Sequence, residues 1–330
     1  MAETKRILLE FERPLEDLYQ KISELRQLTE SSQIDLSEEI LIMENRAKEL
    51  AEKIYQNLKP YQVVQIARHA HRPTTLDLIG LMATGFIELH GDRLYGDDPS
   101  IVGGPAYLDG KIPVMFIGHQ KGKDTKENIY RNFGMANPEG YRKALRLMKM
   151  AEQFKLPIMT LVDTPGAYPG LGAEERGQSE AIARNLMEMS MLKVPVLTVI
   201  VGEGGSGGAL GIAVSNRVYM LEHSVYSVIS PEGCASILFR DASKAQQAAQ
   251  AMQMTAKDML KNKIIEAIIG EPVGGAHNNT CASAASIQAC LQKGLSELRG
   301  MSADELIVQR HKKFRDFGAY TETKLKAESI

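Results

Sequence analysis

Hydrophobic residues near the start of the chain recur every three or four positions, which is the spacing of an amphipathic helix. Two such stripes are present: Leu15, Leu18, Ile22 and Leu25, then Ile40, Met43, Ala47, Leu50 and Ile54. A polar stretch at 31–33 separates them, and Asp35 with Glu38 has the spacing of a capping box that begins the second helix. Residues 1–60 are therefore predicted to form a helical hairpin arm. It either packs against its own body or serves as a dimerisation or docking arm.

Beyond the arm, short apolar runs rich in β-branched residues alternate with helical patterns. Strands are predicted at 100–118, as two strands joined by a turn at 109–110, and at 158–162, 196–201, 217–221 and 226–229. Helices are predicted at 74–88, 138–154, from about Ala173, from 230–233 onward, at 282–298 and at 302–317. Repeated strand–helix units indicate an α/β body with parallel strand pairing, and we assign it to residues 61–330.

The most informative stretch is 196–214, which reads VLTVIVGEGGSGGALGIAV. It predicts a buried strand, a glycine-rich turn and then a helix of small residues. Glycines allow another backbone or a ligand to come close, because no Cβ stands in the way. The start of the helix adds unpaired N–H groups and the positive end of the helix dipole. This turn is therefore a place to hold negative charge, either permanent or developing during a reaction.

The same glycines fit two other interpretations. Gly202, Gly204 and Gly207 spell G-x-G-x-x-G after a strand, and Glu222 follows at a distance that a dinucleotide fold would use. The short helix, the late position in the chain and the extra glycine in 206–209 argue against that fold. The second interpretation is structural, with glycines that only allow tight packing of helix on strand.

Two further motifs resemble parts of hydrolase sites. Asp163-x-x-Gly166 resembles a GTPase switch, but 118–124 reads GHQKGKD and lacks the spacing of a phosphate loop. Gly204–Gly208 satisfies G-x-S-x-G around Ser206, although partners for a serine triad cannot be named.

Composition excludes several classes. The formal net charge of −2 gives no field that attracts nucleic acid or acidic lipid. No apolar run has membrane-spanning length, and the first residues lack a signal peptide's apolar core. The three cysteines form no C-x-x-C pair, so neither a disulfide framework nor a zinc ribbon is expected. His69 and His71 stand at i, i+2 and do not share a helix face. A cytoplasmic protein without a bound metal is predicted.

Several long segments resemble one family. They are DTPGAYPGLGAEERGQSEAIARNL at 163–186, VGEGGSGGALGIA at 201–213, YSVISPEGCASIL at 226–238 and PVGGAHNN at 272–279. They are similar to the carboxyltransferase α subunit of acetyl-CoA carboxylase of the bacterial and plastid type. The resemblance runs in order from the arm to about Tyr320. It implies a crotonase-like fold, a spiral of ββα units, which agrees with the α/β repeats above.

The resemblance also implies a reaction and its partners. A biotin carboxyl carrier protein delivers carboxybiotin, and the carboxyl group moves to acetyl-CoA to give malonyl-CoA, the first committed step of fatty acid synthesis. The α subunit receives carboxybiotin, and a β subunit supplies most of the acetyl-CoA site in an α2β2 assembly. ATP is used by a separate biotin carboxylase subunit. The expected location is the cytoplasm, or the plastid stroma for a plastid protein.

For this role the glycine stretch supplies backbone donors to the biotin oxygen that gains negative charge. We place the donors at Gly207 and Gly208, with Gly204 and Gly205 as near alternatives. Gly166 and Ala167, which follow the preceding strand, form the facing wall of the substrate site. Biotin itself takes the proton of acetyl-CoA, so no side-chain base is required. Lys121, Lys123 and Arg131 are candidate contacts for phosphate or carboxylate, although solvated surface is the simpler interpretation of each.

A non-catalytic scaffold that keeps the arm and the fold but not the reaction is the alternative function. The intact glycine stretch favours the catalytic subunit.

Overall fold

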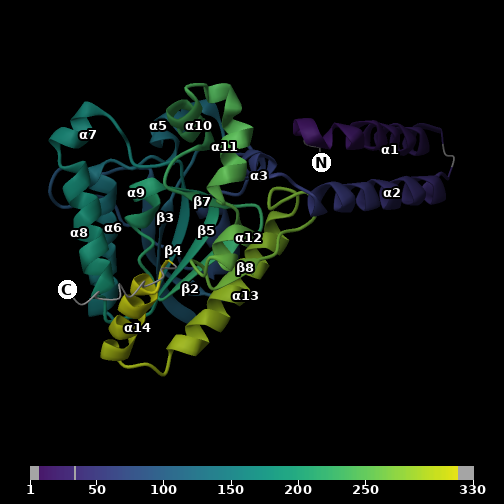
Figure 1. Ribbon diagram of the computed structural model, residues 1–330. Helices are drawn as coiled ribbons and strands as arrows, with labels where there is room; N and C mark the ends of the chain where they lie inside the picture. Colours follow the sequence, from purple (N-terminus) through teal and green to yellow (C-terminus); the bar gives the residue numbers. More distant parts are fainter. Residues whose placement is uncertain (1–6, 33–34, 319–330) are drawn as a thin grey trace, which may run out of the picture.

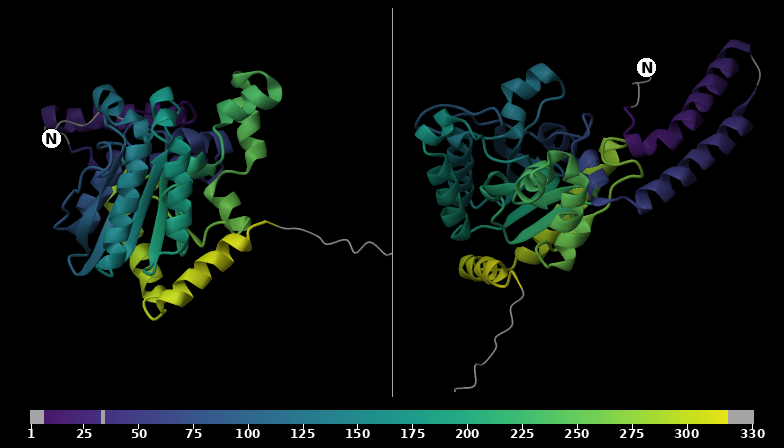
Figure 2. Two further views of the ribbon diagram at one scale, coloured as in Figure 1. Left: turned by 90° about the vertical axis from the view of Figure 1, so that its left-hand side faces the viewer. Right: turned by 45° about the horizontal axis from the view of Figure 1, so that its top comes forward.

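The structure is a computed structural model that describes residues 7–32 and 35–318. Its N-terminal part is an antiparallel pair of helices that extends away from an α/β body, as Figures 1 and 2 show. The elements of this part are η1 (Glu10–Glu12), α1 (Arg13–Ser32) and α2 (Ser37–Gln56). Leu15 and Ile22 of α1 and Ala47 of α2 are buried, so members of both predicted stripes lie inside the structure.

The start of α2 differs from the predicted capping box. The helix begins at Ser37, and its N-cap residue Leu36 has no side chain that can accept a hydrogen bond. Asp35 lies one position too early to be the N-cap, and it accepts a hydrogen bond from the backbone N–H of Ser37 at 3.0 Å instead. Because α1 continues to Ser32, the linker begins later than predicted, and Gln33 of the predicted turn lies outside the described residues.

Arm and body are joined by direct contacts. The ring Nε2 of His69 lies 2.9 Å from the backbone oxygen of Ile7, and the rings of Tyr55 and His223 pack edge to face with centroids 5.5 Å apart. A groove of about 930 Å³ is lined mainly by α1 and α2 and is bordered on one side by residues of the body such as His69 and His277. The division into 1–60 and 61–330 as separate domains stays a prediction.

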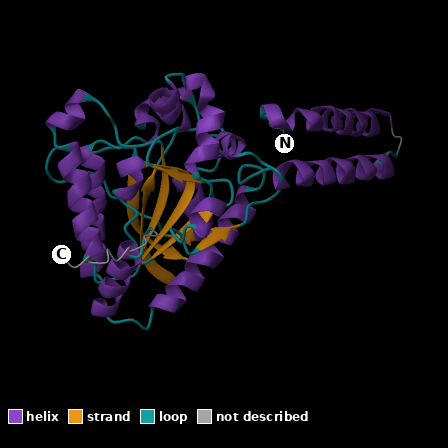
Figure 3. Cartoon of the chain, viewed as in Figure 1, coloured by secondary structure: helices purple, strands orange, loops and turns teal. Residues whose placement is uncertain are grey.

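The body is built around one sheet, whose strands are orange in Figure 3. The sheet has eight strands in the order β1-β2-β3-β4-β5-β6-β8, and β7 pairs with β5. The first three strands are antiparallel and all later pairings are parallel, which confirms the predicted parallel pairing. The strands are β1 (Ala83–Thr84), β2 (Ile101–Leu108), β3 (Ile112–His119), β4 (Ile158–Thr164), β5 (Val196–Gly205), β6 (Arg217–Leu221), β7 (Val225–Ser227) and β8 (Ala267–Ile269).

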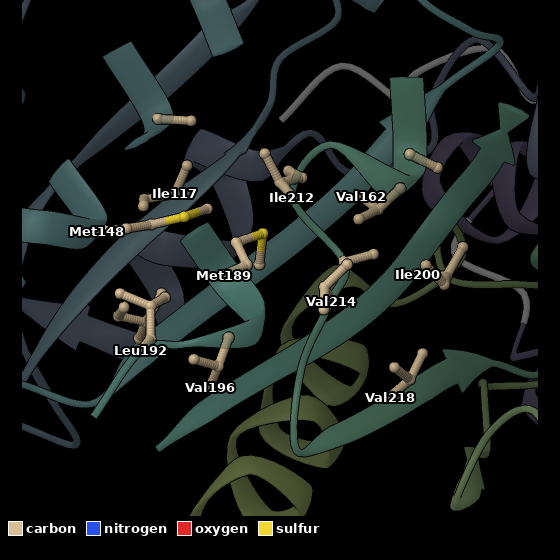
Figure 4. Packing of buried hydrophobic residues seen from close by; sticks show 14 of the residues in the cluster. Ile117, Met148, Val162, Met189, Leu192, Val196, Ile200, Ile212, Val214 and Val218 are labelled. Carbon is tan, nitrogen blue, oxygen red and sulfur yellow. The ribbon is translucent and has the colours of Figure 1, made fainter. Parts of the chain in front are cut away.

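Helices cover both faces of this sheet. The helices of the body are α3 (Pro60–Ala67), α4 (Thr75–Met82), α5 (Thr125–Tyr130), η2 (Asn132–Gly134), α6 (Pro138–Gln153), α7 (Leu171–Glu175), α8 (Gln178–Ser190), α9 (Ser206–Leu210), α10 (Pro231–Phe239), η3 (Ala242–Lys244), α11 (Ala245–Met252), α12 (Ala256–Lys261), α13 (Thr280–Leu298) and α14 (Ala303–Arg315). On one face Met148 of α6 and Met189 of α8 pack with Ile117 and Val162 of the sheet, as Figure 4 shows. Helices α4 and α13 contribute to a second buried cluster. Its strand residues, such as Phe116, alternate along the strand with those of the first cluster and belong to the other face of the sheet.

Three predicted boundaries were wrong for local reasons. The helix predicted at 74–88 ends at Met82, because the next residues run beside β2 and the N–H of Ile87 donates to the carbonyl of Pro105. The helix predicted from Ala173 is divided into α7 and α8, since Gly177 has the left-handed φ of 84°. The strand predicted at 226–229 is β7, which begins and ends earlier. Short elements such as α3, α11, α12 and β8 were not predicted.

Candidate active site

The two predicted halves of the site lie side by side. Strands β4 and β5 are parallel neighbours, so the loop after β4 and the turn after β5 leave the same edge of the sheet. A Cβ on Gly208 would lie 2.5 Å from the carbonyl carbon of Gly166 and 2.6 Å from the nitrogen of Ala167. A Cβ on Gly205 would overlap the carbonyl oxygen of Pro165. Both positions therefore require glycine, because the two backbones pack directly on each other.

The loop after β4 and the turn after β5 each have a glycine with open space beside it. A Cβ on Gly166 would meet nothing within 4 Å, and one on Gly207 would lie only in ordinary contact, 3.8 Å from Ile182. Ser206, which directly precedes Gly207, is exposed and has the left-handed φ of 51°. Left-handed backbone is uncommon for serine, so the strand-to-helix turn is sharp at this residue. The space beside Gly166 and Gly207 is where a ligand can reach the backbone.

The four candidate donor glycines fall into two groups. Gly204 and Gly205 belong to β5, where Gly204 pairs with Thr164 of β4 and Tyr226 of β7. A strand between two neighbours directs its amides to them. Gly207 lies in the first turn of α9 with Gly208, where backbone N–H groups have no partner within the helix. Because α9 has only five residues, its helix dipole is weak. It adds little to the binding of negative charge that the sequence predicted at this turn.

A buried ion cluster lies directly beneath the turn. The Nζ of Lys121 is 2.8 Å from Asp163 Oδ1 and 3.0 Å from Glu203 Oε2. The side chains are only 19%, 8% and 10% exposed. The interpretation of Lys121 as a solvated surface lysine was therefore wrong, and its role as a contact for phosphate or carboxylate stays a prediction. A single lysine in a glycine-rich loop resembles a surface residue until its two partners, which are far away in the sequence, are known.

The cluster continues toward the surface through a residue that the sequence did not single out. Arg68 donates from Nε to Glu203 Oε1 at 2.7 Å and from Nη1 to Glu232 Oε1 at 2.8 Å. The hydroxyl of Tyr61 also reaches Glu232, at 3.1 Å. A sequence signal existed for part of this cluster: Glu203 interrupts an apolar strand, and a buried carboxylate requires a partner. Nothing in the pattern indicated that the partners are Arg68 and Lys121.

Mutual pairing keeps Lys121 and Glu203 ionised. Burial alone would lower the pKa of Lys121, but the carboxylates of Asp163 and Glu203 outweigh it and raise that pKa. Burial would raise the pKa of Glu203, but Lys121 and Arg68 lower it below its usual value. These side chains are therefore held as charged pairs and are not poised to exchange protons near neutral pH.

His119, the last residue of β3, lies beside the cluster and is fully buried. Neither ring nitrogen makes a hydrogen bond within the described residues. Burial, followed by the charge of Lys121, lowers its pKa to about 3, while the nearby backbone of Gly208 acts weakly in the opposite direction. His119 is accordingly neutral in the folded protein.

This histidine gives a stability prediction. A folded-state pKa below the usual 6.5 means that stability is fully present above pH 6.5 and is lost as the pH falls toward 3. The unfolding free energy of the unmodified chain is expected to decrease between pH 6 and pH 5. In His119→Leu we expect this decrease to be smaller, by up to about 1.4 kcal/mol per pH unit. Urea unfolding at several pH values measures it. His90→Gln, at a largely exposed histidine, serves as the control, and an unchanged slope in His119→Leu would contradict the prediction.

Of the remaining candidates, Lys123 is exposed, Arg131 has a largely buried side chain, and His69 lies at the arm. Lys123 pairs with Asp77 at 2.6 Å, and Arg131 pairs with Glu127 at 3.0 Å, so neither lies free beside the glycines. His69 stacks on His277 with ring centroids 3.7 Å apart. Among the described residues no group of three or more histidine, cysteine or acidic side chains could hold a metal ion. Over the same residues, the helices are too short or too polar to cross a membrane.

Solved structures with a similar fold are carboxyltransferases and related enzymes. The transcarboxylase 12S structure has a TM-score of 0.56 at 18% identity, covering 71% of this chain and 44% of that chain. A Pseudomonas malonate decarboxylase hetero-tetramer has a TM-score of 0.54 at 19% identity, covering 66% of this chain and 86% of its own. The fold is thus the crotonase-like fold of carboxyltransferases, as predicted.

Sequence comparison identifies the family. The family model described as acetyl co-enzyme A carboxylase carboxyltransferase-like matches residues 8–318. A relative named acetyl-coenzyme A carboxylase carboxyl transferase subunit alpha, from Halalkalibacterium halodurans, is 57% identical over 313 residues, 95% of this chain and 96% of the relative. One of the same name from Staphylococcus haemolyticus is 56% identical over 315 residues, 96% of this chain and 100% of the relative. The chain belongs to this family of carboxyltransferase α subunits. Membership makes it part of a biotin-dependent transferase, and a non-catalytic scaffold is not favoured.

Proposed function

We propose that this chain forms the half of the carboxyltransferase site that receives carboxybiotin from the biotin carboxyl carrier protein. A β subunit, in an α2β2 assembly, supplies most of the site for acetyl-CoA, which becomes malonyl-CoA. The observation that carries the proposal is the turn after β5, where Gly205 and Gly208 pack on the loop after β4 while Gly207 stays accessible.

The backbone of the turn fits a small planar group. Gly166 and Gly207 have open space where a side chain would stand, so a ring can approach the main chain there. Carboxybiotin, when bound, supplies the carboxyl group and an oxygen on which negative charge develops. The N–H groups of Gly207 and Gly208 donate hydrogen bonds to that oxygen, and one such donor is worth about 10²- to 10³-fold in rate. Gly204 and Gly205 are the weaker alternatives, because their amides face neighbouring strands.

No side chain of the cluster is assigned as a general base. Lys121, Asp163 and Glu203 are bound to one another at 2.8 and 3.0 Å and lie beneath the turn. Gly166 and Ala167 form the wall that faces the donor glycines. They exclude water from one side of the gap between this wall and the donors. This chain therefore contributes backbone donors and shape, which agrees with a reaction in which the carrier-borne group is also the base.

A second subunit over the gap is supported by the surface around it. Helices α5, α7 and α10 follow the carboxyl ends of β3, β4 and β7 and lie at the same end of the sheet (Figure 1). They expose large apolar side chains: Ile129 63%, Tyr130 65%, Leu171 75%, Ile237 71% and Leu238 65%. Apolar patches of this kind at the rim of a site are typical of a protein interface. Use of ATP belongs to a separate biotin carboxylase, and the proposed location is the cytoplasm, or the plastid stroma for a plastid protein.

The test is the reverse reaction with free biotin. The chain is co-expressed with the β subunit of its own organism, and the complex is given malonyl-CoA and biotin. We expect malonyl-CoA to be converted to acetyl-CoA only when biotin is present. A complex that assembles normally but shows no biotin-dependent loss of malonyl-CoA would refute the proposal.

A further inference from the structure

We propose that the buried cluster of Lys121, Asp163 and Glu203 positions the turn at 204–208, which supplies the backbone donors. Lys121 and Asp163 are then positioning residues for carboxyl transfer. The inference rests on the proposed function of that turn. The cluster joins the carboxyl ends of three adjacent parallel strands, since Lys121 follows β3, and Asp163 and Glu203 lie near the ends of β4 and β5. It therefore connects the point where the loop after β4 begins with the point where the turn after β5 begins. These two segments are the walls of the proposed site.

The geometry links the charges to the backbone. Asp163 Oδ1 accepts the Nζ of Lys121 at 2.8 Å and also the backbone N–H of Glu203 at 2.9 Å. Glu203 immediately precedes Gly204 and Gly205, so this bond fixes where β5 leaves the sheet. The pairing of β4 with β5 shifts its register at the same point, between Val162 and Thr164. The carboxylate thus replaces a regular ladder contact just before the turn.

The strand is built to admit this carboxylate. A Cβ on Gly202 would overlap Asp163 Oδ1, so the side chain of Asp163 occupies the space that a side chain at 202 would need. A glycine inside a strand costs stability relative to alanine. Glycine at 202 leaves room for the carboxylate of Asp163, which holds the backbone N–H of Glu203 in place of a neighbouring strand. This role accounts for the cost.

Lys121 keeps the two carboxylates together. Asp163 and Glu203 both bind the same ammonium group, and their side chains are 8% and 10% exposed. Without that charge, Arg68 still pairs with Glu203, but Asp163 loses the ammonium group that lies between it and Glu203, and the two carboxylates repel each other and must separate. Because Asp163 also holds the N–H of Glu203, such a movement displaces the backbone that leads into the turn. Loss of Lys121 is therefore expected to disturb the donors without removing any of them.

The test uses the assembled complex and compares two lysine-to-methionine variants. Lys121→Met is expected to lower kcat for malonyl-CoA-dependent carboxylation of biotin by about 10²-fold, the value of a misplaced oxyanion donor. The KM for malonyl-CoA is expected to change by less than about threefold, since uniform binding is unaffected. Lys143→Met is the matched control. Lys143 is fully buried and binds Asp97 at 2.5 Å, but it touches neither wall of the gap, so the variant is expected to lose thermal stability and to keep its kcat.

A double variant separates charge balance from folding. Lys121→Met with Glu203→Gln removes the unbalanced carboxylate, and the glutamine amide can donate to Asp163. We expect kcat per folded complex to recover about tenfold over Lys121→Met alone, as coupled neighbours do in a double-mutant cycle. Any of three results would overturn the inference: normal kcat in Lys121→Met, an equal loss in Lys143→Met, or no recovery in the double variant. If the unmodified complex does not carboxylate biotin, the proposed function fails first, and this inference falls with it.

Discussion

Purified without its partner, this chain is expected to carboxylate no biotin and to consume no malonyl-CoA. Within the described residues there is one glycine turn of the oxyanion type, at 204–208, whereas the biotin oxygen and the thioester oxygen each need a donor set as charge develops. Turnover is expected to be lower than that of the complex by at least about 10²-fold, the contribution of one missing donor set. Malonyl-CoA consumption in the presence of biotin, measured for each subunit alone and for the mixture, tests this.

Titrating the β subunit into a fixed amount of this chain is the control for an inactive preparation. Activity should rise until the two are equimolar and then stay constant. Robust turnover by the isolated chain would show that the site is complete without a partner, and it would refute the shared-site proposal. Thermal unfolding of the isolated chain establishes that the inactive sample is folded.

Much of the fold follows from local pattern. The run of β-branched residues before Gly202 predicted a strand, and the glycines after it predicted a turn and a short helix, which are β5 and α9. The strand is longer than predicted, because Gly204 and Gly205 continue its pairing with β7. Alternation of strand and helix predicted the parallel body, and the order of several motifs predicted the family.

The ion cluster beneath the site could not be predicted in the same way. Arg68 and Glu203 are 135 positions apart, and Lys121 and Glu203 are 82 positions apart, so no local spacing connects them. Their partnership depends on strand order, which places the ends of β3, β4 and β5 next to each other. The helix break at Gly177 depends on one left-handed residue, and glycine inside a helical pattern is compatible with either outcome.

The glycine at 208 provides the sharpest mutational test. Gly208→Val is expected to lower carboxyl transfer by about 10²-fold or more, because the added side chain meets the backbone of Gly166 and Ala167 and displaces the donors. Assembly with the β subunit is expected to survive, since the turn faces the gap. Gly208→Ala already places a Cβ 2.5 Å from Gly166, so it is expected to impair transfer in the same direction while adding the least volume.

A second crowded glycine distinguishes a site effect from a packing effect. A Cβ on Gly103 in β2 would lie 2.7 Å from Leu147 and 2.8 Å from the carbonyl oxygen of Phe116, which is comparable crowding outside the gap. Gly103→Ala is therefore expected to lower thermal stability about as much as Gly208→Ala and to keep its kcat per folded complex. If the Gly208 variants assemble and retain near-normal kcat, the turn is not the oxyanion site. If both glycine positions lose activity only in proportion to folded protein, tight packing is their whole role.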